Sequence, residues 1–445
     1  MQKEFWLRNR FRLDAVSPRA RFGRCALCSC VAAALLAGCG GSQSQPSIGS
    51  PVSPLTSSRG GSAIQHVVMI MQENRSTDNL FYGYPNANVQ SYGYNVKGQK
   101  IELKPVDLQT GWDLAHDSSS FVTDCDGTGT LPHTGCRMNG FDEEYYECGK
   151  PGYPACPNAN PPYSYVPHNE TKPYFAMAQQ YVLGDEMFAS NFDFSDFVSH
   201  QYIVAGQADN TVNGPSGPPG CEGGPTDWIM TLQGTRVHPC FGYTTLAKEL
   251  DQAKLSWRYY TSSYNRDGGL WSAYQADKYV FYGPDWKKDV ISPQTQFFSD
   301  VKAGKLPVVS WITPTCEDSD HAGCDSDAGP SWVASLVNAV GESKYWDSTA
   351  IFVFWSSAGG WYDHVPPPYL SDDSLGMRVP LLVISAYAKQ NYVSHVRYEH
   401  GSMLKFIENR FGLPPMAVSD KRANSPEQDC FDFSQSPRKF TPIPY

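Results

Sequence analysis

The sequence predicts an α/β fold built on a central, mostly parallel sheet, and three observations lead to this expectation. Apolar runs over residues 64–71, 308–312, 350–355 and 379–386 have the length and the Val, Ile and aromatic content of buried strands. Segments with helical spacing of apolar residues separate several of these runs. Strands that alternate with helices favour parallel pairing, with helices covering both faces of the sheet.

The expected elements follow one another along the chain. The first strand, 64–71, is interrupted only by Gln65 and His66, and Pro173 suits the first turn of a helix over 172–180. The later elements are a helix over 246–252, strands over 255–260 and 308–312, a helix over 330–340, strands over 350–355 and 379–386, and a helix over 401–411. Two polar stretches, 82–170 and 208–240, are expected to be long loop insertions in a single domain over 62–445.

The first 38 residues differ in composition from the rest of the chain. Seven basic side chains precede an apolar stretch over 25–37, which is the order of a secretory signal peptide and is too short to span a bilayer. The ending Leu36-Ala37-Gly38-Cys39 resembles the bacterial lipobox, so Cys39 is the expected lipidation site. Residues 39–61 are expected to be a flexible tether. The chain is therefore expected to be exported and lipid-anchored in the bacterial cell envelope, at the outer membrane or the periplasmic face.

Acidic side chains dominate the chain, whose formal net charge is −10. Residues 1–38 hold seven basic and two acidic side chains, so without them the net charge is −15. Nucleic-acid binding needs a basic surface, and nucleic acid is therefore not an expected partner.

Nine cysteines follow Cys39, and clustered cysteines in the polar loops of an exported chain favour disulfides. No two of them have the C-x-x-C spacing of a zinc site. Eight fall into couples that are close in sequence: Cys125/Cys136, Cys148/Cys156, Cys221/Cys240 and Cys316/Cys324. Sequence alone does not fix the pairing, but these couples are the favoured choice, and they leave Cys430 over.

Polar residues follow two of the predicted strands directly. Gln72-Glu73-Asn74-Arg75-Ser76 comes after the first strand, and residues 356–364, beginning with Ser356 and Ser357, come after the strand over 350–355. Ligands of open α/β sheets bind outside the carboxyl ends of the strands. We therefore expect these two segments, nearly 280 positions apart, to form one site.

These residues resemble the bacterial phosphoesterase family that contains phospholipases C and acid phosphatases. The resemblance rests on the two strand-end motifs, of which the second continues as Gly-Gly-Trp-Tyr-Asp-His-Val-Pro-Pro-Pro, and runs from about residue 62 to the end. It implies the three-layer α/β sandwich of alkaline phosphatase and metal-assisted hydrolysis through a covalent phosphoserine or phosphothreonine. It also implies that Glu73 and Asn74 are oxygen ligands of a divalent metal ion.

The resemblance places the nucleophile in the segment 191–200, where this chain has one residue more than the family pattern. Counting forward from Phe188 selects Ser195, and counting back from His200 selects Asp196. Ser195 is the predicted nucleophile because the chemistry needs a hydroxyl, whereas Asp196 would form an acyl phosphate. His116 and His321 match the family's remaining motifs, and they are expected to contact phosphate or to transfer protons.

The sequence departs from the family at the second strand end. Family members carry an acidic pair there to complete the metal site, and this chain has Ser356 and Ser357. With Glu73, Asn74 and these two serines as ligands, the metal would meet one formal negative charge, so its affinity is expected to be low and the ion could be absent.

The predicted function is phosphoester hydrolysis, of the phospholipase C or the acid phosphatase type, on a phosphomonoester or a phospholipid. The alternative is a catalytically impaired family member that serves as a phosphate-binding or surface-binding lipoprotein. A sulfatase is disfavoured because the chain lacks a Cys/Ser-x-Pro-x-Arg motif after the first strand.

Overall fold

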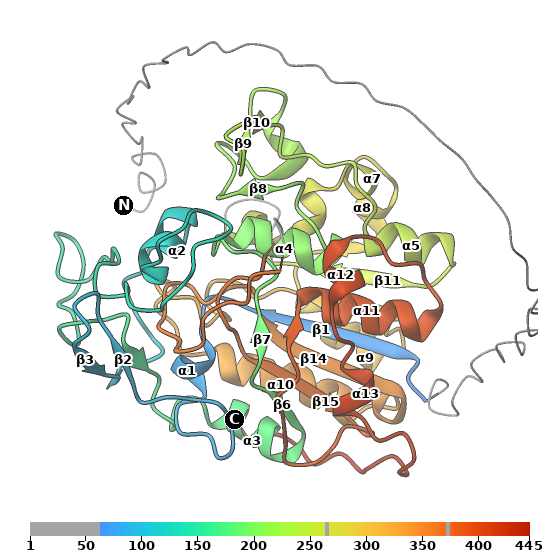
Figure 1. Ribbon diagram of the computed structural model, residues 1–445. Coiled ribbons are helices and arrows are strands. Elements are labelled where there is room, and N and C mark those ends of the chain that lie inside the picture. Colours follow the sequence, from blue (N-terminus) through green and yellow to red (C-terminus); the bar gives the residue numbers. More distant parts are fainter. Residues whose placement is uncertain (1–62, 263–266, 371–373) are drawn as a thin grey trace, which may run out of the picture. The chain divides into compact units, whose positions relative to one another are not determined.

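The computed structural model describes residues 63–445 except 263–266 and 371–373 (Figure 1). The predicted signal peptide, Cys39 and the tether over 39–61 lie outside these residues.

An eight-stranded sheet forms the centre of the described domain, with strand order β12-β11-β13-β1-β14-β15-β6-β16. Its strands are β1 (His66–Gln72), β6 (Val182–Gly184), β11 (Trp257–Tyr260), β12 (Val290–Ile291), β13 (Val309–Ile312), β14 (Thr349–Trp355), β15 (Leu381–Ser385) and β16 (Tyr392–Ser394). Five of these strands, β1, β11, β13, β14 and β15, were expected from the sequence, and each begins and ends within two residues of its predicted bounds. The two central strands, β1 and β14, are buried along almost their whole length, as a parallel sheet covered on both faces requires.

The sheet is mostly parallel, which confirms the predicted fold class. From β12 through β14 every neighbouring pair is parallel. The strand β15 runs antiparallel to both of its neighbours, β14 and β6. The carboxyl ends of β13, β1 and β14 therefore lie side by side at one edge of the sheet.

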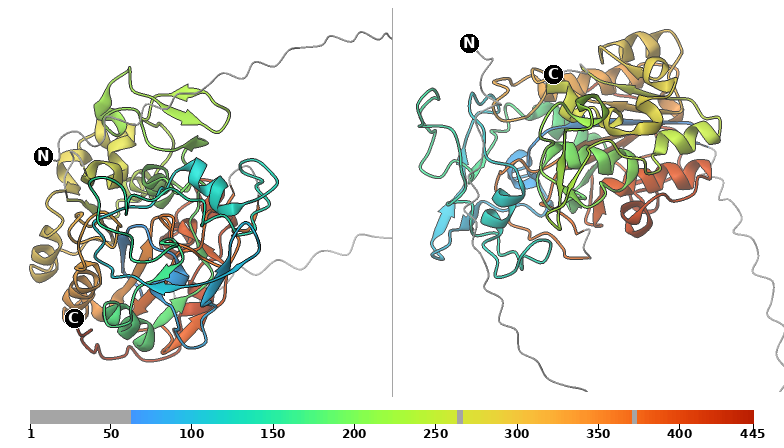
Figure 2. Two further views of the ribbon diagram at one scale, coloured as in Figure 1. Left: turned by 90° about the vertical axis from the view of Figure 1, so that its left-hand side faces the viewer. Right: turned by 90° about the horizontal axis from the view of Figure 1, so that it is seen from above.

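Helices cover both faces of the sheet, so the domain has three layers (Figures 1 and 2). The helix α10 contacts α3 and α9, and α4 contacts α5 and α11. The helices are α1 (Thr77–Leu80), α2 (Ser118–Cys125), α3 (Lys172–Gln180), α4 (Asp196–Ala205), α5 (Leu246–Gln252), α6 (Asp267–Trp271), α7 (Lys278–Phe281), α8 (Asp285–Lys288), α9 (Gln296–Lys302), α10 (Gly329–Gly341), α11 (His400–Phe411), α12 (Val418–Arg422) and α13 (Glu427–Cys430).

The two predicted insertions contain only short elements. The first holds α2 and the strands β2 (Tyr92–Tyr94), β3 (Lys100–Glu102), β4 (Lys104–Pro105) and β5 (Ser164–Tyr165), and the second holds β8 (Thr211–Val212), β9 (Ile229–Thr231) and β10 (Arg236–Val237). A separate pair, β7 (Met187–Phe188) and β17 (Tyr398–Glu399), leads the chain toward α4 and α11. All four favoured disulfides are present, and Cys430 is free and buried.

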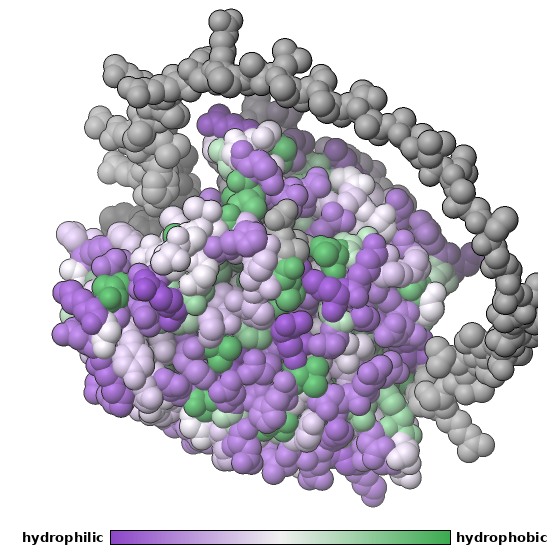
Figure 3. Space-filling model, in the orientation of Figure 1, coloured by the Kyte–Doolittle hydropathy of each residue, from purple (hydrophilic) through white to green (hydrophobic). Residues whose placement is uncertain are grey.

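The visible face of the described domain is mostly hydrophilic, with hydrophobic residues scattered singly (Figure 3). Within the part of the chain that the structure describes, no helix combines the length and apolarity needed to cross a bilayer.

Candidate functional site

The two strand-end motifs meet at the carboxyl edge of the sheet, as the sequence predicts. Gln72 at the end of β1 is paired in register with Trp355 at the end of β14. The contact continues past the strands, because the Ser356 amide donates to the Gln72 carbonyl at 2.9 Å and the Arg75 amide donates to the Ser357 carbonyl at 3.1 Å.

The loop that follows β13 is fixed to the same edge. The Gln72 side chain accepts a hydrogen bond from the Asp320 amide at 2.9 Å and donates to the Asp318 carbonyl at 2.9 Å. The Arg75 Nε donates to the Asp320 carbonyl at 2.7 Å. This loop carries His321, so three neighbouring strands contribute residues to one site.

Glu73 is fully buried, and both of its carboxyl oxygens have partners. One lies 2.9 Å from His200 Nε2, and the other accepts a hydrogen bond from the Ser356 hydroxyl. Burial raises the pKa of Glu73, and the His200 imidazole opposes this shift. The Glu73 carboxyl is therefore held between an imidazole from α4 and a hydroxyl from the end of β14.

Asn74 is held in a second contact of the same kind. Its Oδ1 accepts a hydrogen bond from the Ser357 hydroxyl at 2.8 Å, and its backbone has a positive φ of 59°. Gly359 packs against it so closely that a Cβ atom there would lie 2.4 Å from Asn74 Cβ. The close approach of Asn74 thus requires glycine at position 359.

These four predicted metal ligands lie together, but they do not fit a hard divalent cation as they stand. Both Glu73 oxygens and the Asn74 Oδ1 are engaged in hydrogen bonds, and the serines add no charge. Asp363, the next acid along the loop, forms an ion pair with Arg378 at 3.0 Å. A cation of this class prefers several anionic or carbonyl oxygens with free lone pairs.

The N-terminus of α4 brings Asp196 to the site. Ser195 is the N-cap of this helix and makes no side-chain capping hydrogen bond, and Asp196 is its first residue. Asp196 Oδ2 accepts a hydrogen bond from Trp271 Nε1 at 3.0 Å and lies 3.6 Å from His321 Nε2. Its Oδ1 is buried and has no hydrogen-bond partner among the described residues.

His116 and His321 face this carboxylate from two different loops. Each ring donates a hydrogen bond from Nδ1 to a backbone carbonyl, of Leu114 for His116 and of Ala322 for His321, because a carbonyl can only accept. The ring centroids lie 5.2 Å apart. The Nδ1 of each ring is therefore occupied, and Nε2 is the nitrogen left to act on a ligand.

Asp196 and His321 stabilise each other's charged forms. Burial alone would lower the pKa of His321, but the charge of Asp113 and the interaction with Asp196 raise it to about 9. Burial would raise the pKa of Asp196, but the imidazoles of His321 and His116 bring it below its usual range. At neutral pH the structure thus favours an ionised Asp196 beside a protonated His321.

The structure places the predicted site residues in two adjoining groups. The first consists of Glu73, Asn74, Ser356 and Ser357, and the second of His116 and His321 with Asp196 beside Ser195. No sequence pattern singled out Trp271, which donates a hydrogen bond to Asp196 at 3.0 Å. In the sequence, His200 served only to locate the nucleophile, and its contact with Glu73 at 2.9 Å depends on how α4 is placed beside the residue that follows β1.

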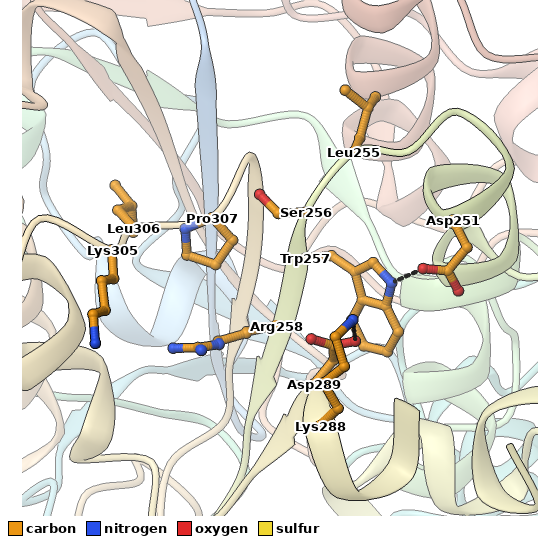
Figure 4. A pocket seen from close by; sticks show the side chains of 10 residues that line it. All are labelled: Asp251, Leu255, Ser256, Trp257, Arg258, Lys288, Asp289, Lys305, Leu306 and Pro307. Atoms are coloured by element: carbon orange, nitrogen blue, oxygen red, sulfur yellow. Dashed lines mark hydrogen bonds and ion pairs between the residues drawn. The ribbon is translucent and has the colours of Figure 1, made fainter. Parts of the chain in front are cut away.

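A pocket elsewhere in the domain has no part in this chemistry. Its volume is about 410 Å³, and residues that precede or begin β11 and β13 line it, among them Leu255, Trp257 and Pro307 (Figure 4). These positions are at the amino ends of the parallel strands, whereas the site described above is at the carboxyl ends.

Comparison with known proteins gives matches over most of the chain. A model of the Phosphoesterase family matches residues 64–414. The non-hemolytic phospholipase C of Pseudomonas aeruginosa is 26% identical over 418 residues, which cover 81% of this chain and 55% of that protein. Phospholipase C B of Mycobacterium tuberculosis is 24% identical over 406 residues, which cover 79% of this chain and 74% of that protein.

The chain spans about half the length of the Pseudomonas relative and of a second non-hemolytic phospholipase C, from Burkholderia pseudomallei. Among solved structures, a protein of the alkaline phosphatase superfamily from Vibrio parahaemolyticus matches with a TM-score of 0.38 and 11% identity, covering 83% of this chain and 71% of that one.

Proposed function

Because the chain belongs to the Phosphoesterase family, we propose that it hydrolyses phosphoester bonds where Asp196, His116 and His321 meet. The observation that most supports this proposal is the grouping of an ionised carboxylate and two imidazoles at the N-terminus of α4. A helix N-terminus and an imidazolium both favour the negative charge of a phosphoryl group.

The residues of this cluster have complementary tasks in such a reaction. The protonated His321 donates its Nε2 proton to the leaving oxygen, and His116 holds a non-bridging oxygen of the phosphoryl group. Ser195 and Asp196, adjacent at the start of α4, are the two candidate nucleophiles. Attack by the Ser195 hydroxyl gives a phosphoseryl intermediate, and attack by Asp196 gives an acyl phosphate.

The resemblance to the family also implies metal assistance, with Glu73 and Asn74 as ligands. Since the oxygen ligands that Glu73, Asn74 and the two serines offer do not fit a hard divalent cation, the steps above use only protein groups. Glu73, His200, Ser356 and Ser357 then form a hydrogen-bonded group beside Asp196 and the two imidazoles.

The names of the relatives, which are phospholipases C, support a proposal for the substrate class. We take it to be a phosphomonoester or the head group of a phospholipid. The four disulfides fit an exported protein, and Cys39 would attach it to the membrane that contains such a lipid.

The test is hydrolysis of p-nitrophenyl phosphate and p-nitrophenylphosphorylcholine by the purified chain without residues 1–38. We expect turnover of at least one substrate and a 10²-fold to 10⁴-fold loss in His321→Gln, which keeps the shape of a polar side chain but cannot act as an acid. The exposed residue Asp209 supplies the control Asp209→Asn, expected to retain full activity. Absence of turnover by the unmodified chain would refute hydrolysis of these esters and favour the phosphate-binding lipoprotein.

A further inference from the structure

We propose that Asp196 is the nucleophile and that the chain passes through an aspartyl phosphate instead of a phosphoserine. This inference rests on the proposed phosphoester hydrolysis and names the residue that attacks phosphorus. Its basis is the environment of the two Asp196 oxygens, which differ from each other.

The two oxygens of Asp196 have separate roles in the structure. Oδ2 is held by Trp271 Nε1 at 3.0 Å and faces His321 Nε2 at 3.6 Å, which fixes the orientation of the carboxylate. Oδ1 is buried but has no donor among the described residues. A buried acceptor without a partner is costly, and its lone pairs are available to an electrophile.

Ser195 lacks the corresponding support. Its amide donates to Asp193 Oδ1 at 3.3 Å, and its side chain makes no capping hydrogen bond to α4. A serine nucleophile needs a group that takes its proton. His321, which faces the neighbouring Asp196, is paired with that carboxylate and carries a proton of its own at neutral pH. An ionised carboxylate needs no such base.

The serines at the end of β14 agree with this assignment. A hydroxyl nucleophile needs a base or a metal ion to activate it, and here the oxygens of Glu73 and Asn74 that could hold a metal ion accept hydrogen bonds from the Ser356 and Ser357 hydroxyls. Asp196 brings its own negative charge to the site, and His321 and His116 neutralise it.

The reaction has two balanced steps. A lone pair of Asp196 Oδ1 forms a bond to phosphorus while the phosphorus–oxygen ester bond breaks, and the leaving oxygen takes the Nε2 proton of His321. Water then attacks phosphorus, the bond from phosphorus to Oδ1 breaks, and the carboxylate is restored. The proton of that water returns to His321, and phosphate, or a phosphate monoester from a diester, leaves.

The test is the chemical lability of the covalent intermediate. The chain is mixed with ³²P-labelled p-nitrophenyl phosphate, quenched in acid and treated with neutral hydroxylamine. Hydroxylamine cleaves acyl phosphates and leaves phosphoserine intact. We expect label that hydroxylamine removes and that is absent in Asp196→Asn. Borohydride reduction followed by mass spectrometry should find homoserine at position 196. Ser195→Ala should lose less than tenfold in turnover, whereas Asp196→Asn should lose at least a thousandfold.

Beryllofluoride gives a readout that does not require turnover, because it mimics a phosphoryl group bound to a carboxylate. We expect bound fluoride signals in ¹⁹F NMR of the unmodified chain and of Asp209→Asn, and none in Asp196→Asn. Hydroxylamine-resistant label on Ser195 would overturn the aspartyl phosphate and leave the proposed hydrolysis standing. Beryllofluoride bound through Asp196 without turnover of either ester would support the assignment of the carboxylate and refute hydrolysis of those substrates. Neither turnover nor bound fluoride would refute both.

Discussion

Replacing His200 with leucine is expected to destabilise the protein by about 3–5 kcal/mol, because it leaves the Glu73 carboxyl buried without its strongest partner. His200 Nε2 and Glu73 Oε1 are 2.9 Å apart, and both side chains are completely inaccessible to solvent. Only the Ser356 hydroxyl would remain on the carboxyl. Removing one member of such a pair costs more than removing both, since the remaining group keeps its desolvation penalty.

The same reasoning predicts a dependence on pH. Burial raises the pKa of Glu73, and without His200 the pKa rises further. A carboxyl whose pKa is raised in the folded state destabilises the fold above the pKa of the unfolded chain, and the penalty disappears as pH falls and the group takes up a proton. The loss caused by His200→Leu should therefore be larger at pH 8 than at pH 5.

Urea unfolding followed by tryptophan fluorescence at the two pH values measures this effect. The double variant Glu73→Gln with His200→Leu should recover most of the lost stability, since it removes the buried charge. Lys100 provides a control: it pairs with Glu102 at 2.6 Å, but the two side chains are 49% and 51% exposed, so Lys100→Leu should cost little stability. A loss from His200→Leu no greater than that of the control, or equal at both pH values, would refute the reasoning.

Three further predictions concern charge. Since the pKa of His321 is raised to about 9, kcat/KM should be level at neutral pH and fall above about pH 9. A decline of kcat/KM that begins near pH 6.5 would contradict the ion pair between His321 and Asp196. The variant Ser356→Asp with Ser357→Asp should bind Mn²⁺ in calorimetry at least tenfold more tightly than the unmodified chain, and equal affinity would show that the serines do not limit cation binding. Burial raises the pKa of Asp124 well above its usual range, so Asp124→Asn should stabilise the protein at pH 7 by roughly 1–3 kcal/mol. This gain in stability should shrink toward pH 4, and a loss of stability at pH 7 would contradict the prediction.

The central sheet could be predicted because its strands are buried on both faces. A continuous apolar run such as residues 64–71 leaves few alternatives, and the structure places β1 there. Short strands at the margin, such as β12 and β16, lack this signal because two or three residues do not make a pattern. The antiparallel direction of β15 could not be seen either, since a buried strand has the same composition whichever way it runs.

The site was predictable to the extent that it lies on strand ends. Glu73, Asn74, Ser356 and Ser357 meet because β1 and β14 are parallel neighbours, which the alternation of strands and helices implies. The contact between Asp196 and His321 depends instead on the register of α4. One extra residue in 191–200 shifts a side chain on the first turn by about 100° around the helix axis. Sequence spacing could not decide that shift, whereas Trp271 and His321 in the structure both face Asp196.

The two departures from the family pattern have one electrostatic explanation. Each of the serines 356 and 357 removes a negative charge at the end of β14 and supplies a hydroxyl that donates to Glu73 or Asn74. The Glu73 carboxyl and the Asn74 side-chain oxygen are thus satisfied by hydrogen bonds at that edge. Negative charge appears instead at Asp196, where two imidazoles and the N-terminus of α4 offset it. Burial and the charge of Asp196 already raise the pKa of Glu73, and acids at positions 356 and 357 would add to this repulsion between like charges, which the two serines avoid.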